Sequence, residues 1–261
     1  MRIGRFMLGD RIFYGKIVSG DVFEIEGLPF GSIRETEKRH RLSDLKILAP
    51  VDPPNIICIG LNYKTHASES SMEVPARPEI FLKLTTSVTG PGDPVIIPKA
   101  APDEIDYEAE LCVVIGRRAK SVGEDEAPDY VLGYTCGNDV SARDCQLKLD
   151  RQWARGKSFD TFCPLGPWIE TELDPTALPI RGLLNGNVVQ ESNTSHMIFS
   201  AAQIVSYCSM HFTLLPGTVI MTGTPEGVGF ARRPPLFVKA GDVFTVEIGG
   251  IGRLESRFVN E

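Results

Sequence analysis

The feature that most restricts the fold of this chain is a succession of short apolar runs, each entered from a turn containing Gly-Asp or Pro-Gly. Such runs occupy residues 92–97, 216–221 and 241–246, and each has the length and turn chemistry of a β-strand. Two stretches are typical of helices: residues 141–154, which open with a Ser cap, and residues 200–212. The pattern predicts a mixed β structure with a few helices, of the α+β class.

A Pro-rich joint at residues 49–54 divides the chain into two predicted domains. The first, residues 1–50, is small and β-rich. In it we expect short strands, one of them broken at Gly15, and a solvated loop or helix end in the charged residues 34–41. The second domain, residues 51–261, holds every segment that suggests chemistry.

The composition argues against two classes of binding partner, nucleic acids and membranes. The 27 Lys and Arg residues against 34 Asp and Glu residues give a net charge of −7 without any basic run, so nucleic acid is not an expected partner. No apolar stretch is long enough to cross a bilayer and no signal peptide is evident at the start, so no membrane partner is expected. The six cysteines form no Cys-x-x-Cys pair, which suits reduced thiols and a cytoplasmic location.

The most informative segment is residues 105–116, whose second half has the composition of a buried strand. If the strand extends back through Tyr107, Glu108 and Glu110 project from one face, roughly 6.5–7 Å apart along the chain. Two carboxylates on the face of an apolar strand repel each other and require a cation. A hard divalent ion such as Mg²⁺, Mn²⁺ or Ca²⁺ fits; the alternative is an edge strand with two solvated Glu side chains.

A third carboxylate favours the metal site. Asp139 stands at the end of the apolar strand 131–137, just before the predicted helix, where an acid is typical of a ligand or of a turn. Arg143 and Gln146 would share a helix face pointing back towards Asp139, since they are three residues apart. Their side chains suit a bound carboxylate, although a solvated helix face is the alternative. Lys157 is suited either to stabilising an enolate or to a surface position.

Together these segments resemble the fumarylacetoacetate hydrolase family. The resemblance runs from about Pro54 to the C-terminus and rests on five segments in family order. They are residues 60–63 with His66 and Glu69, residues 107–111, residues 137–144, residues 156–167 and residues 222–229.

The resemblance implies a β-roll-like catalytic domain after a small N-terminal domain, and a homodimer. The positions expected to bind Mg²⁺ or Mn²⁺ are Glu108, Glu110 and Asp139. The positions expected to surround a small 2-oxo acid substrate are Arg143, Gln146, Lys157 and Thr224. The family pattern also makes His66 and Glu69 a catalytic dyad on a lid.

Spacing is compatible with the dyad, because His66 and Glu69 are three residues apart and one helical turn would bring them together. Without the resemblance, His66 would be interpreted as an ordinary polar loop residue. Glu69 would then hold His66 in the tautomer that removes a proton from water. The polar residues 68–78 are interpreted as either a closing lid or a flexible loop.

Several reactions remain open from the sequence. A metal beside Lys157 stabilises an enolate, which is formed in hydrolysis of a 2,4-dioxo acid of the acylpyruvate or fumarylpyruvate type, in decarboxylation of an oxaloacetate-type acid, and in isomerisation or hydration of aromatic ring-cleavage products. The intact His66–Glu69 pair favours the C–C bond hydrolase. A protein that binds a 2-oxo acid without catalysis is the alternative from another class.

Overall fold

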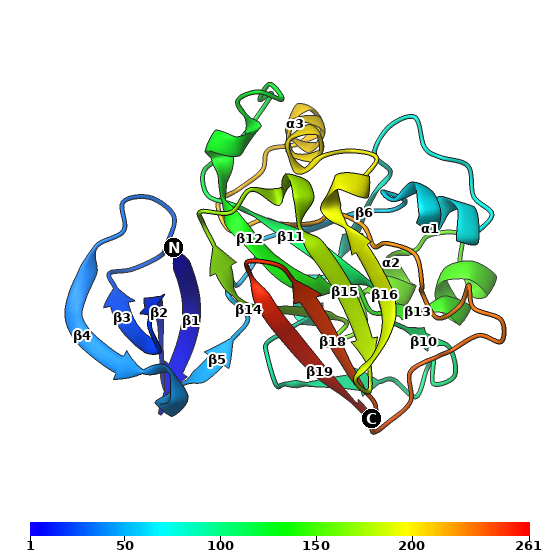
Figure 1. Ribbon diagram of the computed structural model, residues 1–261, viewed down its shortest axis with the longest axis horizontal. Helices are drawn as coiled ribbons and strands as arrows, with labels where there is room; N and C mark the ends of the chain where they lie inside the picture. Colours follow the sequence, from blue (N-terminus) through cyan, green and yellow to red (C-terminus); the bar gives the residue numbers. More distant parts are fainter.

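The computed structural model describes residues 1–261 and is built mainly of strands, in a small N-terminal lobe and a larger lobe (Figure 1). The N-terminal strands are β1 (Arg2–Leu8), β2 (Arg11–Val18), β3 (Asp21–Ile25), β4 (Glu35–Arg41) and β5 (Lys46–Leu48). They pair antiparallel in the order β4-β3-β2-β1, and β5 also pairs with β1.

Two expectations for this lobe are wrong. Strand β2 continues through Gly15 rather than breaking there, because a Cβ at Gly15 would stand 2.4 Å from Val22 Cγ1 and the missing side chain makes room for that neighbour. Residues 34–41 form mainly the edge strand β4 instead of a loop or helix end. Charged side chains are common on edge strands, where they discourage pairing with other chains.

The larger lobe consists of two packed sheets. Its remaining strands are β6 (Ile56–Ile59), β7 (Ile80–Lys83), β8 (Val88–Thr89), β9 (Pro94–Ile97), β10 (Ile105–Asp106), β11 (Ala109–Ile115), β12 (Val131–Asn138), β13 (Ser141–Ala142), β14 (Cys163–Glu170), β15 (Pro179–Leu184), β16 (Asn187–Asn193), β17 (Val219–Met221), β18 (Val243–Ile248) and β19 (Gly252–Asn260). One sheet continues the N-terminal sheet in the order β1-β14-β12-β11-β17-β6-β7, and the other runs β16-β15-β18-β19-β9. A core of 36 buried residues fills the space around them.

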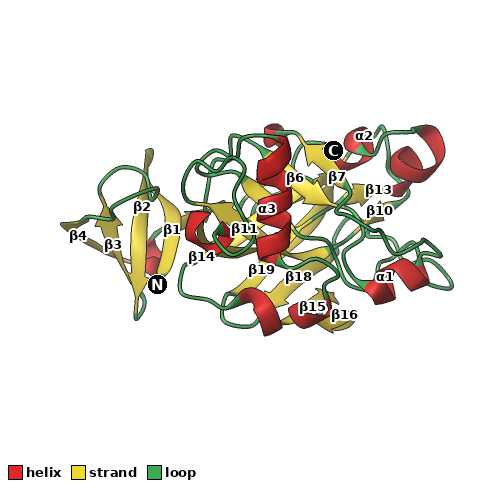
Figure 2. Cartoon of the chain, turned by 90° about the horizontal axis from the view of Figure 1, so that it is seen from above, coloured by secondary structure: helices red, strands yellow, loops and turns green.

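Helices are few and short, and they lie outside the sheets (Figure 2). They are α1 (Lys64–Glu69), α2 (Ala154–Lys157) and α3 (Ala201–His211), with a single π-helical turn at Cys145–Leu149. Single 3₁₀ turns occur at Leu42–Asp44, Thr85–Ser87, Ala127–Tyr130, Pro175–Ala177 and Thr194–His196. The predicted α+β class, mixed β with a few helices, is confirmed.

One predicted helix is confirmed and the other is wrong. Helix α3 begins after Ser200, which forms a reciprocal capping box with Gln203. Residues 141–154 do not form one helix, because Ser141 pairs with Asp106 in the β10–β13 ladder and its hydroxyl donates to the Asp139 carbonyl instead of capping. The helical turn and α2 follow as separate pieces. Strand pairing with a distant segment therefore prevails over the local sequence pattern that favours a helix cap.

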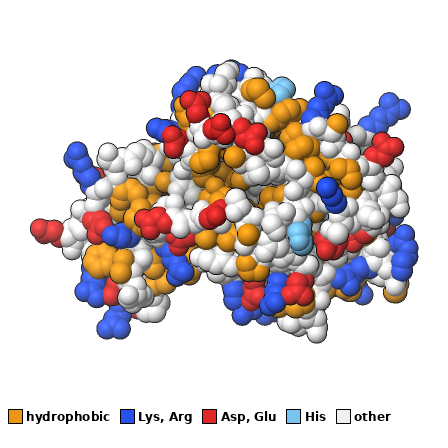
Figure 3. Space-filling model, turned by 45° about the horizontal axis from the view of Figure 1, so that its top comes forward, with side chains coloured by type: hydrophobic (Ala, Val, Ile, Leu, Met, Phe, Trp, Pro, Cys, Tyr) orange, Lys and Arg blue, Asp and Glu red, His pale blue; other side chains and the backbone are white.

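The surface carries charges of both signs, mixed over the face shown in Figure 3, with apolar atoms gathered near its middle. No wide basic patch is visible on that face. None of the helices is both long enough and apolar enough to span a membrane. All six cysteines are buried and unpaired.

Glu24 ties the N-terminal strands together. Its carboxylate accepts a 2.9 Å hydrogen bond from Arg11 Nη1 on β2 and lies 2.6 Å from His40 Nε2 on β4. The Arg11 hydrogen bond, opposed by burial and reinforced by His40, lowers the pKa of Glu24 to about 2. The ionised carboxylate therefore stabilises the folded lobe.

We expect this contribution to be fully present above about pH 4.5, the ordinary value for Glu, and to be lost as the pH falls through the lowered pKa. Glu24→Gln should cost about 1 kcal/mol at pH 7, and its difference from wild type should vanish near pH 2. Hydrogen exchange of the β2–β4 amides measures this, with Glu37→Gln at an exposed position of β4 as control. A Glu24→Gln penalty that stays constant with pH would contradict the assignment.

Candidate active site

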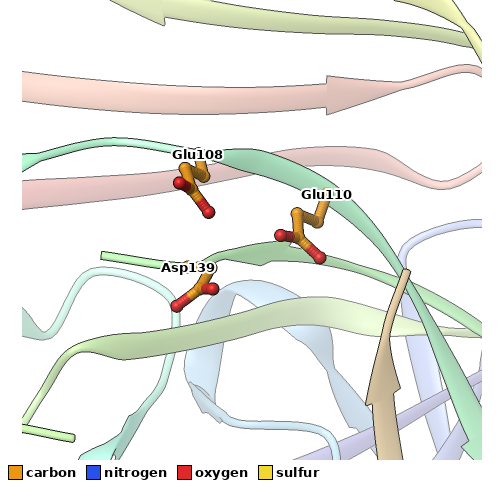
Figure 4. Close-up of side chains that lie close together, drawn as sticks. All are labelled: Glu108, Glu110 and Asp139. Atoms are coloured by element: carbon orange, nitrogen blue, oxygen red, sulfur yellow. The ribbon is translucent and has the colours of Figure 1, made fainter. Parts of the chain in front are cut away.

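The three predicted metal ligands meet at one end of the β11–β12 ladder. Ala109 pairs with Asn138 and Glu110 with Gly137, so Asp139 leaves β12 opposite the start of β11. One carboxylate oxygen from each of Glu108, Glu110 and Asp139 lies within 4.8 Å of the others (Figure 4). All three side chains are buried, at 6%, 1% and 0% exposure. Strand β11 begins at Ala109 rather than at Tyr107, yet the two Glu side chains still converge.

Two lysines and an arginine contact these carboxylates. Lys157 Nζ donates to Glu108 Oε2 and to Asp139 Oδ2, both at 2.8 Å. Lys83 Nζ, at the end of β7, lies 2.5 Å from Asp139 Oδ1. Lys83 was not predicted from the sequence. The one pattern that could have indicated it is a charged residue at the end of an otherwise apolar strand. Lys157 is 2% exposed, so it is not the surface residue considered as the alternative.

The pKa values show how the charges divide. Burial alone would raise the pKa of Glu108, but the charges of Lys157 and Arg143 outweigh it and lower that pKa to about 2. Burial, with the neighbouring carboxylates of Asp139 and Glu108, raises the pKa of Glu110 well above its ordinary value. Burial opposes the charge on Lys157, yet Asp139 and Glu108 raise its pKa, so the ammonium stays protonated.

These residues fit a divalent metal ion. Glu110 Oε2 accepts one hydrogen bond, from the Gly223 amide, and no cationic side chain contacts its carboxylate. Oxygen atoms of carboxylates suit Mg²⁺ or Mn²⁺, and the oxygens of Glu108 and Asp139 that pair with lysine keep a further lone pair. A cation between the three carboxylates would remove the repulsion that raises the Glu110 pKa.

Arg143 is held rigidly beside the carboxylates. Its Nε donates to Asp106 Oδ2 at 2.8 Å, one Nη to Glu108 Oε1 at 2.7 Å and the other to Gln146 Oε1 at 2.8 Å. The proximity of Arg143 and Gln146 was predicted from helical spacing, and both residues do lie in one short helical segment, which is α-helical at Arg143–Asp144 and π-helical at Cys145–Leu149. Asp106, which orients Arg143, was left unassigned because the sequence does not reveal its partner.

The dyad predicted on α1 forms. His66 Nδ1 lies 2.8 Å from Glu69 Oε1, and the carboxylate of Glu69 also accepts from the Gly227 amide. A proton on Nδ1 shared with Glu69 leaves Nε2 of His66 free to accept one. Because His66 is only 6% exposed, its imidazole is shielded from bulk water.

The loop of residues 222–230 anchors three acidic side chains through its backbone. Gly223 donates to Glu110, Gly227 to Glu69, and Gly229 with Phe230 to Asp106. Backbone N–H groups directed at carboxylates stabilise their ionised form. A Cβ at Gly227 would meet the carbonyl oxygen of Val189 at 2.1 Å, so this path of the loop requires glycine.

Thr224, predicted to contact the substrate, is engaged with the protein. Its hydroxyl donates to the Ala109 carbonyl at 3.0 Å and accepts from Gln190 Nε2 at 2.8 Å. Gln190, which is 1% exposed, also accepts from the Ala109 amide. No sequence pattern indicated Gln190, since β16 lies far from the other site residues along the chain.

A small cavity of about 50 Å³ joins the predicted groups. Five predicted residues line it: His66, Glu108, Arg143, Gln146 and Lys157. The other four predicted residues do not line the cavity: Glu69, Glu110, Asp139 and Thr224. Larger depressions of about 570 and 930 Å³ exist elsewhere, but no predicted site residue lines them, so we assign the chemistry to the small cavity.

The fold and the buried carboxylate cluster define a class of β-rich proteins with a candidate site for a divalent metal ion. Residues 55–259 match the family model described as fumarylacetoacetate (FAA) hydrolase C-terminal, and residues 1–50 match one described as Rv2993c-like, N-terminal. The chain therefore belongs to the fumarylacetoacetate hydrolase family.

Relatives and solved structures agree with that placement. A fumarylacetoacetate hydrolase domain-containing protein 2 homolog of Dictyostelium discoideum is 51% identical over 83% of this chain and 75% of its own length. A mitochondrial oxaloacetate tautomerase of Homo sapiens is 43% identical over 83% of this chain and 70% of its own. A structure titled 5-carboxymethyl-2-hydroxymuconate delta-isomerase from Mycobacterium smegmatis is 42% identical, with a TM-score of 0.92 and full coverage of both chains.

The metal assignment can be tested through stability. Glu110→Gln removes one of the repelling carboxylates, so the metal-free variant should unfold at the same temperature as wild type or a higher one. Mn²⁺ at a hundred times its Kd should stabilise wild type by about 2.7 kcal/mol, and this gain should be lost in Glu110→Gln. Thermal unfolding with and without Mn²⁺ measures both effects.

The exposed Glu124 provides a matched control, since Glu124→Gln makes the same chemical change away from the site. An undiminished Mn²⁺ shift in Glu110→Gln would remove Glu110 from the ligand set.

Proposed function

We propose that this protein is a divalent-metal-dependent tautomerase or isomerase that forms the enol or enolate of a small 2-oxo acid. The observation that carries the proposal is that His66, which is held by Glu69, and a protonated lysine, Lys157, line the same small cavity beside the carboxylate cluster. A base and a fixed positive charge are the two groups that enolisation needs.

The substrate would bind with its acid end towards Arg143 and Gln146. Arg143 is fixed by Asp106 and Glu108, and Gln146 Oε1 is occupied by Arg143, which leaves the Gln146 NH₂ group to donate to a carboxylate. Mg²⁺ or Mn²⁺ bound at Glu108, Glu110 and Asp139 would supply Lewis-acid polarisation of the 2-oxo group.

The reaction itself transfers one proton within the substrate. His66 Nε2 takes a proton from carbon 3, the C–H electron pair becomes the C2–C3 double bond, and the carbonyl pair moves to the 2-oxo oxygen. Lys157 stabilises the negative charge that develops there without losing its own proton. His66 then returns the proton to that oxygen, or to another carbon of a conjugated substrate, so no other reactant is consumed.

This proposal differs from the reaction that the sequence favoured. The dyad suggested activation of water for C–C bond hydrolysis, but relatives and structural neighbours carry the names oxaloacetate tautomerase and 2-hydroxyhepta-2,4-diene-1,7-dioate isomerase. Those names support proton transfer to and from carbon, which uses the same histidine without a water nucleophile. The homodimer and the cytoplasmic location stay predictions.

The decisive variant is His66→Gln, which keeps a polar side chain but no base. We expect kcat for conversion of enol-oxaloacetate to the keto form to fall about 10²- to 10⁴-fold, while the Mn²⁺ shift in thermal unfolding persists. Loss of enol absorbance in the ultraviolet and pyruvate release, followed together, separate tautomerisation from decarboxylation.

His211→Gln is the control, because His211 is exposed on α3, away from the cavity. If His66→Gln tautomerised at the wild-type rate, His66 would not be the base. If pyruvate release by wild type kept pace with the consumption of enol, so that no keto-oxaloacetate accumulated, the decarboxylase would be the better description.

A further inference from the structure

One polar group of the cavity is not used by anything described so far. Ser70 follows α1 directly and lines the cavity with His66. Five buried side-chain polar atoms in the protein have no hydrogen-bond partner, among them Ser70 Oγ, and Ser70 is the only one of these five residues that lines this cavity. A buried hydroxyl without a partner costs free energy, commonly about 1–3 kcal/mol, until something pairs with it.

The charged groups of the cavity are already paired with each other or with a neighbouring side chain. Lys157 and Arg143 pair with Glu108, and His66 pairs with Glu69. They come from the β13–α2 region and from the first turns of α1, whereas Ser70 begins the segment that leads from α1 to β7. Ser70 is therefore a separate hydrogen-bonding position in the same cavity.

The rest of the lining is mainly apolar. Seven of the fourteen lining residues are hydrophobic, among them Phe81, Trp153 and Phe230. In such surroundings an oxygen on the substrate that reached no donor would lose its hydration without replacement. The cavity is small, about 50 Å³, so a bound acid must lie close to its walls.

We propose that Ser70 donates a hydrogen bond to an oxygen on carbon 4 of the substrate and so selects short 2-oxo acids that carry an acceptor there, such as 2-oxo dicarboxylates of four carbons. This inference rests on the proposed enolisation and names the substrate class of the same site. Arg143 and Gln146 recognise the acid end next to the 2-oxo group, and Ser70 recognises the distal end.

Two substrates of equal carbon number test this. Oxaloacetate has a carboxylate at carbon 4, and 2-oxobutanoate has a methyl group there. In Ser70→Ala, kcat/KM for oxaloacetate should fall about tenfold, the usual consequence of losing one hydrogen bond to a charged group. Enolisation of 2-oxobutanoate, followed by deuterium exchange at carbon 3, should change less than twofold.

Three controls isolate the effect. Ser70→Thr keeps a hydroxyl and should retain most of the activity on oxaloacetate. Ser68→Ala makes the same change at an exposed position of α1 and should leave both substrates unaffected. Oxalate, which has no distal carbon, should inhibit wild type and Ser70→Ala with equal inhibition constants, showing that the acid end is intact.

The possible outcomes distinguish failure of the role of Ser70 from failure of the proposed function. An equal loss on both substrates, or no loss on either, overturns the role of Ser70 and leaves the proposed enolisation standing. A wild-type protein that enolises neither acid overturns the proposed function, and the substrate preference falls with it.

Discussion

Compensation of buried negative charge is the constraint on which this structure depends. Four carboxylates, those of Asp106, Glu108, Glu110 and Asp139, are buried within one cluster, against the three buried cations Lys83, Arg143 and Lys157. Carboxylates removed from water without partners would cost several kcal/mol each. The ion pairs and loop amides offset that cost for Asp106, Glu108 and Asp139. Glu110 has no cationic partner and its pKa is raised, so a metal ion bound there would take the place of a proton.

The sheet places the charged side chains and the loop amides that compensate one another. Pairing of β11 with β12 fixes Glu110 and Asp139, while β17, the strand next to β11, leads into the loop of residues 222–230. That loop donates backbone hydrogen bonds to a proposed metal ligand, to the orienting residue of Arg143 and to Glu69 of the dyad. One segment thus aligns groups with different roles, which is how a rigid scaffold keeps catalytic geometry precise.

Local patterns in the sequence predicted part of this arrangement. Alternation placed Glu108 and Glu110 together, and an i, i+3 spacing placed His66 beside Glu69, because both relations depend on backbone periodicity alone. The pairings of Lys83 with Asp139 and of Gln190 with Thr224 span 56 and 34 residues. No local rule links such positions. The predicted helix at residues 141–154 failed for the same reason, since the competing interaction was a ladder to the distant Asp106.

The link between the loop and the dyad bears on when the site can react. Glu69 orients His66 while it is itself held by the Gly227 amide, so the base is oriented only when α1 lies against the loop. The next residue, Ser70, lines the cavity in the same arrangement. A movement of α1 away from the loop would break the Glu69–Gly227 contact and would release His66 from its orientation. The orientation of His66 therefore depends on the same packing of α1 that encloses the cavity, and this packing favours proton transfer in a shielded site.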